Sequence, residues 1–316
     1  MKTFTKILGG LVLALLLLAA GALALSWAPD RPVEALKARW APPPSQFVPV
    51  LGMQVHVRDE GPRDDPQPIV LLHGTSASLH TWDGWAATLV PTRRVIRMDL
   101  PGFGLTGPSA AHDYTQAAYA RFVVAVLDTL GVKQPVVLAG NSLGGSVAWK
   151  TAADAPQRVA RLVLVDSGGY PMQATSVPIG FKLAQYGALR PLLQNVLPRS
   201  MIESSVRNVY GDPSRVTTEL VDRYYELTLR EGNRAALVER FSQFKGGEAI
   251  AQIPQIRQPT LILWGGRDRL IPPALGERFE HDIAGSRRIV FPELGHVPQE
   301  EDPQRTVAAL VDFLKT

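Results

Sequence analysis

The 316-residue chain contains no cysteine. This absence excludes a thiol nucleophile, a disulfide and a metal held by thiolates. It also excludes a lipoprotein anchor, because there is no N-terminal cysteine to carry the lipid. If the chain is exported, it therefore needs no oxidative folding.

Strong charge bias is also missing. The 33 basic and 29 acidic residues give a net charge of +4, with no block of like charges and no basic stretch interleaved with aromatic residues. A nucleic-acid-binding role is therefore excluded. The composition, 46% hydrophobic and 20% charged, is that of a globular chain able to bury a large core. With no internal repeat or low-complexity tract, it predicts one domain with an insertion.

The most informative motif is Gly140-Asn141-Ser142-Leu143-Gly144, which follows an apolar run at 135–139. A G-x-S-x-G sequence between a strand and a helix is typical of a nucleophile elbow, a sharp turn that lifts the serine hydroxyl clear of the sheet. Gly140 and Gly144 suit this turn, because its flanking positions want residues without side chains. The pattern predicts Ser142 as a nucleophile at the positive end of the next helix, where an oxyanion is favoured.

Two further polar residues follow predicted strands in the order that such a nucleophile requires. Asp268 comes after the apolar run 259–264, and His296 comes after the run 288–291. Parallel sheets place their ligand crevices at the carboxyl ends of the strands, so we expect both side chains near Ser142. The chain order Ser, Asp, His differs from that of other serine-hydrolase folds. We therefore predict a catalytic triad of Ser142, Asp268 and His296.

Asp166 and Asp99 compete for the role of the triad acid, since each also follows an apolar run. We prefer Asp268 because its loop continues into a short, rigid segment at Pro272-Pro273. Asp99 starts a glycine-rich turn, where a structural cap is the favoured interpretation.

The oxyanion hole is expected to consist of the backbone N–H groups of Thr75 and Leu143. Acyl transfer needs one donor from the residue after the nucleophile and one from the loop after an early strand. Leu143 is the first, and the run 68–72 followed by His73-Gly74-Thr75 supplies the second. His73 itself is interpreted as a hydrogen-bonding residue that shapes this loop.

Taken together, these motifs resemble the α/β-hydrolase superfamily over about residues 46 to 316. Among its branches, the chain looks most like bacterial lipolytic family V esterases and lipases and their membrane-anchored phospholipase A relatives. The resemblance implies a mostly parallel eight-stranded sheet with helices on both faces, a helical cap insertion, and neither a cofactor nor a metal. It is carried by His73-Gly74, Asp99-Leu100-Pro101-Gly102-Phe103-Gly104, Gly140-Asn141-Ser142-Leu143-Gly144-Gly145, Gly265-Gly266-Arg267-Asp268 and Gly295-His296.

The N-terminal region contains an apolar run from Ile7 to Leu25, 19 residues long, preceded by Lys2 and Lys6. A membrane span needs about 20 apolar residues, whereas a signal-peptide core has about 7 to 15. We therefore expect a retained transmembrane anchor at 1–30, with a cytoplasmic N-terminus by the positive-inside rule. The protein would then be a single-pass protein of the inner (cytoplasmic) membrane, with its catalytic domain on the periplasmic side. A cleaved signal peptide, for which alanines at 20, 22 and 24 offer cleavage sites, is the alternative.

The rest of the chain is expected to form a Pro-rich juxtamembrane spacer at 31–45, a hydrolase domain at 46–168 and 259–316, and a helical cap at 169–258. The cap is inferred from the roughly 90 residues between two successive strands, near Val165 and Thr260. A crossover connection needs only about a dozen residues. The excess is best interpreted as a lid over the strand ends.

The sequence thus predicts a serine ester hydrolase that works through an acyl-enzyme on Ser142. The expected anchor favours membrane-derived acyl lipids, as for a phospholipase A. The elbow also resembles that of carbon–carbon hydrolases of aromatic ring-cleavage pathways, although the loop after His73 lacks the Gly-Pro-Gly pattern expected there. A non-enzymatic ligand-sensing protein on a hydrolase scaffold is a third alternative, against which the intact triad argues. Epoxide hydrolases and dehalogenases need a carboxylate in place of Ser142.

The expected partners follow from this function. They are an acyl ester or phospholipid substrate, membrane lipids through Ile7 to Leu25, and a second copy of the chain in a homodimer.

Overall fold

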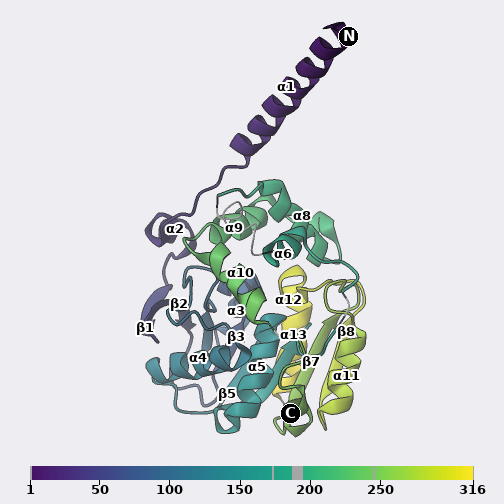
Figure 1. Ribbon diagram of the computed structural model, residues 1–316. Coiled ribbons are helices and arrows are strands. Elements are labelled where there is room, and N and C mark those ends of the chain that lie inside the picture. Colours follow the sequence, from purple (N-terminus) through teal and green to yellow (C-terminus); the bar gives the residue numbers. More distant parts are fainter. Residues whose placement is uncertain (1, 173, 187–194, 245, 316) are drawn as a thin grey trace.

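The computed structural model describes residues 2–172, 174–186, 195–244 and 246–315, and within them eight strands form one sheet (Figure 1). The strand order is β1-β2-β4-β3-β5-β6-β7-β8. β2 is antiparallel to both β1 and β4, and the other neighbours are parallel. The predicted mostly parallel eight-stranded sheet is therefore confirmed. The strands are β1 Gln46–Val50, β2 Met53–Glu60, β3 Ile69–Leu72, β4 Val95–Met98, β5 Val136–Asn141, β6 Val159–Val165, β7 Thr260–Gly265 and β8 Arg287–Phe291.

Helices cover both faces of the sheet because the parallel strands are apolar on both sides. Along β3, Val70 and Leu72 join the core under α4 (Gln116–Thr129), α5 (Leu143–Asp154) and α11 (Ala274–Asp282). Ile69 and Leu71 join the opposite core, under α3 (Asp83–Leu89) and α13 (Pro303–Leu314). A short helix, α12 (Pro298–Glu301), precedes α13. This two-sided burial is the reason that the strands appear in the sequence as continuous apolar runs.

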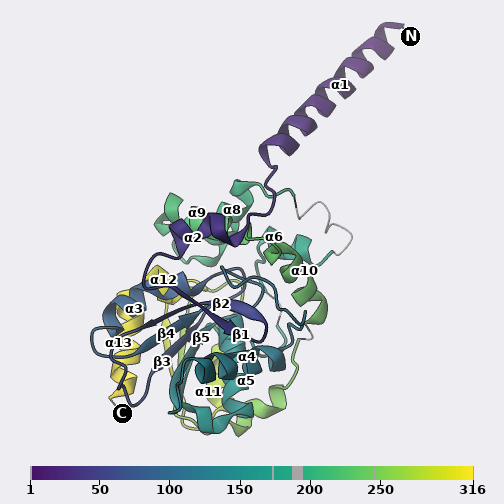
Figure 2. The same ribbon diagram turned by 90° about the vertical axis from the view of Figure 1, so that its left-hand side faces the viewer.

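The chain between β6 and β7 is helical and lies at one end of the sheet, towards α1 (Figures 1 and 2). Its helices are α6 Ile179–Ala184, α8 Arg199–Val209, α9 Thr218–Thr228 and α10 Asn233–Gln243. Two of them, α8 and α9, share a small apolar cluster that includes Val206, Tyr210 and Val221. The division into a hydrolase domain and a cap at 169–258 stays a prediction.

The segment predicted as a Pro-rich spacer contains a helix, α2 (Val33–Trp40), which lies beside α9 in Figure 2. Leu36 and Trp40 are buried against Leu105 and Leu227. Trp40 Nε1 also donates a hydrogen bond of 2.6 Å to Glu226 Oε2. Residues 33–40 are thus part of the packed molecule, and the proline run that suggested a spacer begins only after this helix.

The first helix, α1 (Lys2–Leu25), projects away from the rest of the molecule in both views (Figures 1 and 2). In the part of the chain that the structure describes, no helix combines the length and the apolar character needed to cross a bilayer. The prediction of a single-pass inner-membrane protein with a periplasmic catalytic domain is therefore wrong. It rested on the length of a 19-residue apolar run alone, which lies close to the length of about 20 residues that a span needs. The expected contact of this run with membrane lipids loses its basis as well.

Candidate active site

Ser142 occupies the turn between β5 and α5 in a strained conformation, with φ 55° and ψ −115°. Residues other than glycine rarely adopt such a positive φ, and at a strand-to-helix turn it is the geometry of a nucleophile elbow. The turn is tight enough to exclude side chains on both sides. A Cβ on Gly140 would lie 2.1 Å from Gly144 O, and one on Gly144 would lie 2.2 Å from Leu72 O.

His296 and Asp268 are buried together at the ends of their strands. His296 Nδ1 lies 2.7 Å from Asp268 Oδ2. The other oxygen of Asp268 accepts hydrogen bonds from the N–H groups of Leu270 and Ile271, at 2.8 and 2.9 Å. These contacts fix the carboxylate against Nδ1 and leave Nε2 as the nitrogen available to Ser142, which borders the same cavity as His296. The structure thus brings the three predicted residues to one place, and their catalytic role stays a prediction.

Asp166, the competing acid, lies in the same cluster. One polar atom from each of Asp166, Asp268 and His296 lies within 4.8 Å of the others. Burial, and then the charge of Asp268, raise the pKa of Asp166 well above its ordinary value of 3.8. The raised pKa favours the protonated form of Asp166, and Asp268 is the carboxyl group in direct contact with His296.

The cluster of two acids and one histidine is also a donor set that a metal could use. The oxygens of Asp268, however, already accept hydrogen bonds from the backbone of Leu270 and Ile271 and face His296 Nδ1. Asp166 Oδ1 accepts a hydrogen bond of 2.9 Å from Gly265 N–H. Three of the four carboxyl oxygens are therefore engaged, and only Asp166 Oδ2 has no partner among the described residues. Because a side-chain hydrogen bond with Asp268 contributes to the raised pKa of Asp166, we assign the cluster to proton sharing between the two carboxyl groups.

Two residues that sequence reasoning did not single out hold the histidine loop in place. Asn141 Nδ2 donates to His296 O at 2.9 Å and to Val165 O at 3.2 Å, which ties the elbow to the loop. Glu301 accepts hydrogen bonds from Gly295 N and Gly211 N, at 2.8 and 2.9 Å, and so ties this loop to the segment after α8. Asn141 lies inside the recognised motif, but Glu301 carries no sequence signal of its own.

The predicted oxyanion donors border the cavity around Ser142. Leu143 is the first residue of α5, so its N–H has no acceptor inside the helix. Thr75 follows Gly74, on which a Cβ would lie 3.1 Å from Ser142 Cβ. His73 shapes this loop, as its Nδ1 lies 2.7 Å from Gly74 O and its Nε2 accepts a hydrogen bond from Leu100 N–H. Burial lowers the pKa of His73, which favours the neutral ring that these contacts require.

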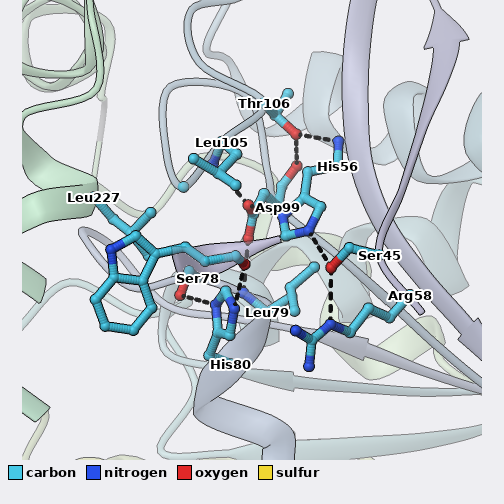
Figure 3. A network of polar contacts seen from close by, with 12 residues as sticks. Ser45, His56, Arg58, Ser78, Leu79, His80, Asp99, Leu105, Thr106 and Leu227 are labelled. Atoms are coloured by element: carbon cyan, nitrogen blue, oxygen red, sulfur yellow. Dashed lines mark hydrogen bonds and ion pairs between the residues drawn. The ribbon is translucent and has the colours of Figure 1, made fainter. Parts of the chain in front are cut away.

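Asp99 is a structural cap (Figure 3), which agrees with the interpretation of its glycine-rich turn from the sequence. Its carboxylate accepts hydrogen bonds from Leu79 N–H at 2.7 Å and from Leu105 N–H at 2.8 Å, and it lies 2.7 Å from His56 Nδ1. The carboxylate is fully buried, and the adjacent His56 holds the pKa of Asp99 far below its ordinary value against the opposing effect of burial. All of these contacts stabilise the loops around β4, so Asp99 has no role at Ser142.

Two cavities meet at Ser142. The smaller, of about 120 Å³, is bordered by His296 and Thr75 and by apolar side chains of the cap helices, among them Met201, Ile202, Val206 and Leu237. The larger, of about 410 Å³, is bordered by Leu143 and Thr75 and extends to Tyr119 and Arg240. The nucleophile therefore stands between an apolar space on the side of His296 and a more polar space on the side of the expected oxyanion hole.

This fold and site can be compared with known proteins. Residues 67–303 match the model of the alpha/beta hydrolase fold family. The chain belongs to this family. The curated relatives of this hydrolase include a 2-hydroxy-6-oxononadienedioate/2-hydroxy-6-oxononatrienedioate hydrolase from Pseudomonas sp., which is 30% identical over 269 residues, covering 82% of this chain and 91% of the relative.

The solved structures that resemble this hydrolase include proteins with different names. A membrane phospholipase A, described as a bacterial virulence factor, is 25% identical with a TM-score of 0.72, and the match covers 98% of each chain. The meta-cleavage product hydrolase CumD from Pseudomonas fluorescens is 24% identical with a TM-score of 0.72, over 86% of this hydrolase and 97% of that chain. The second likeness shows the fold alone.

Proposed function

We propose that this hydrolase cleaves carboxylic esters through an acyl-enzyme on Ser142. The observation that carries the proposal is the buried pair of His296 and Asp268, 2.7 Å apart, beside a serine held at φ 55°. His296 takes the proton of Ser142 as its oxygen attacks the ester carbonyl, and Asp268 stabilises the imidazolium that forms. The N–H groups of Thr75 and Leu143 stabilise the oxyanion. His296 then protonates the departing alcohol, and water releases the acid by the reverse sequence.

The shape of the site supports a substrate with an apolar part. The smaller cavity, next to His296, is bordered in part by aliphatic side chains of α8 and α10. We propose that residues 169–258 act as a cap that closes this space over Ser142. An enclosed apolar site strengthens the electrostatic contacts of the reacting atoms, because it excludes water.

A second candidate function is the hydrolysis of a carbon–carbon bond, which the names of several curated relatives favour. The same triad serves this reaction, but the leaving group is then a carbon that a conjugated carbonyl must stabilise. The substrate named for one of these relatives is a dioate, which carries two carboxylates. Here Arg223, a partly buried arginine on α9, is occupied by an ion pair with Glu300. This pairing makes Arg223 unsuitable as a partner for either carboxylate.

The two functions separate in one kinetic experiment. The wild-type hydrolase is assayed with p-nitrophenyl esters of increasing acyl length and with a 2-hydroxy-6-oxo-dienoate. We expect ester turnover that Ser142→Ala lowers by a factor on the order of a million, as removal of a triad nucleophile does elsewhere. Ser242→Ala is the matched control, because Ser242 is exposed and its hydroxyl bonds only to Glu239 O. Faster turnover of the dienoate than of every ester would establish the second function, and an active Ser142→Ala protein would contradict both.

A further inference from the structure

The larger cavity contains a cation that the proposed chemistry does not use. Arg240 lies on α10 and borders the cavity that also contains Ser142 and Leu143. Its side chain is almost fully buried, at 7% relative exposure. A buried guanidinium ordinarily has a carboxylate partner, because an unpaired charge is costly to desolvate.

Arg240 has no such partner among the described residues. The polar group that acts on it is the hydroxyl of Tyr119, and burial lowers the pKa of Arg240. The rings of Phe241 and Phe244 flank the guanidinium, with centroids 5.4 and 5.7 Å from its Cζ. The residues outside the described set, 1, 173, 187–194, 245 and 316, include no aspartate or glutamate side chain. Since a guanidinium has five N–H donors, one phenol leaves most of them without an acceptor.

Two glutamines of this cavity have partners of their own. Gln116 Nε2 donates to Ser146 O and Oγ, at 2.9 and 2.8 Å. Gln243 accepts a hydrogen bond from Tyr114 N–H and donates one to His112 O. The one acid at the rim, Glu248, is exposed and makes no ion pair with Arg240 in the part of the chain that the structure describes. Arg240 is therefore the group in this space that still lacks a counter-charge.

The position of Arg240 relative to the triad says which part of the substrate reaches it. His296, the group that protonates the leaving alcohol, borders the smaller cavity. Leu143, whose N–H belongs to the expected oxyanion hole, borders the larger one. The acyl part of a substrate bound to Ser142 therefore extends into the larger cavity, towards Arg240.

We propose that Arg240 binds an oxyanion group, a carboxylate, on the acyl part of the substrate. The preferred substrates are then half-esters of dicarboxylic acids, with the free carboxylate at Arg240 and the ester carbonyl at Ser142. This inference rests on the proposed serine-hydrolase function and names its substrate class. A planar guanidinium pairs with a carboxylate through two parallel hydrogen bonds, which gives both affinity and orientation.

The test compares two ester series that differ only in charge. The charged series consists of mono-p-nitrophenyl esters of dicarboxylic acids from succinate to suberate, and the neutral series has the free acid methylated. For the best chain length we expect the wild-type kcat/KM to favour the charged ester by about 10- to 100-fold. Arg240→Met should abolish this preference, measured as the ratio of kcat/KM for the charged and the neutral ester in the same protein, and Arg240→Lys should keep part of it. The matched control is Arg207→Met, which removes a cap charge at an exposed arginine paired with Glu203.

A binding measurement separates this proposal from the function on which it rests. Calorimetric titration of the Ser142→Ala protein with adipate needs no turnover, and we expect binding that the additional Arg240→Met substitution removes. Titration with inorganic phosphate identifies the group, since tighter binding of phosphate than of adipate would overturn the carboxylate assignment. A charge preference that survives in a folded Arg240→Met protein, or adipate binding that does not depend on Arg240, would overturn the role of Arg240. If the wild-type protein turned over no ester and adipate still bound through Arg240, only the ester-hydrolase function would be rejected.

Discussion

Replacing each of the two clustered aspartates by asparagine should affect activity to very different extents. In Asp268→Asn the amide cannot stabilise the imidazolium and favours the wrong tautomer of His296, for which a serine protease triad loses about ten-thousand-fold in kcat. In Asp166→Asn the amide replaces a carboxyl group whose raised pKa favours the neutral form. Its oxygen can accept the hydrogen bond from Gly265 N–H, now 2.9 Å long, and its NH2 group can donate to Asp268 as the carboxylic acid does. We therefore expect kcat/KM of Asp166→Asn to stay within about tenfold of the wild-type value.

The same substitution has a signature in stability. The pKa of Asp166 is raised by burial and by Asp268, so the folded protein holds a proton that the unfolded chain loses near pH 3.8. Between these two pKa values the folded state binds more protons, and the free energy of unfolding falls as pH rises, by about 1.4 kcal/mol per pH unit. Asparagine cannot ionise. The stability of Asp166→Asn relative to wild type should therefore increase by about 1.4 kcal/mol per pH unit until Asp166 ionises in the folded protein.

Urea unfolding of both proteins at pH 5, 6, 7 and 8 measures this difference, and ester kinetics at pH 7.5 give the activity. Because wild type and variant share every titrating group outside the cluster, the difference reports on the coupled pair of Asp166 and Asp268. A constant difference across this pH range would refute the shared proton. Inactive Asp166→Asn together with active Asp268→Asn would show that Asp166 is the triad acid.

Three further substitutions test the framework of the site. Gly144→Ala should lower the free energy of unfolding in urea by several kcal/mol, because the added Cβ would lie 2.2 Å from Leu72 O and prevent correct closure of the elbow. Gly131→Ala is the control, since φ is 67° there and nothing lies within 4 Å of the added atom. It should cost only about 1 kcal/mol. Asp99→Ala should lower stability by about 3 kcal/mol or more, since three buried donors lose their acceptor, and an equally stable variant would contradict the structural role. Burial lowers the pKa of His80 from 6.5 to about 4, so stability should fall with decreasing pH across this interval by up to about 1.4 kcal/mol per unit. His80→Gln should lack that slope. If the stability of His80→Gln and of the wild type depended on pH in the same way, His80 would be protonated in the folded protein across this interval.

The arrangement of the sheet and the meeting of Ser142, Asp268 and His296 could be predicted because each depends on local patterns. Apolar runs mark strands that are buried on both faces, and polar residues at their carboxyl ends meet at one edge of the sheet. The choice between Asp268 and Asp166 was harder, since both follow strands. It depends on which carboxyl group is deprotonated, and that follows from burial and from the distance between them, neither of which a sequence shows.

Contacts between distant segments could not be predicted. Glu301 fixes the His296 loop by accepting backbone N–H groups from Gly295 and Gly211, and nothing in its own neighbourhood marks it for this. The lack of a counter-charge at Arg240 is likewise a property of the folded cavity. The wrong prediction at the N-terminus has another cause. It used only the length of the apolar run to choose between a membrane anchor and a cleaved signal peptide, and this length lies close to the limit for a membrane span. The homodimer stays a prediction.

The central claim, that Ser142 is a nucleophile activated by His296, is tested most directly by covalent labelling. The wild-type hydrolase is treated with an alkyl fluorophosphonate, which phosphonylates only activated serines, and the intact protein and its peptides are weighed by mass spectrometry. We expect one adduct, on the peptide that contains Ser142, with no labelling in Ser142→Ala and strongly slowed labelling in His296→Ala. A wild-type protein that is folded and unlabelled at Ser142, or a Ser142→Ala protein labelled as fast as wild type, would contradict the account.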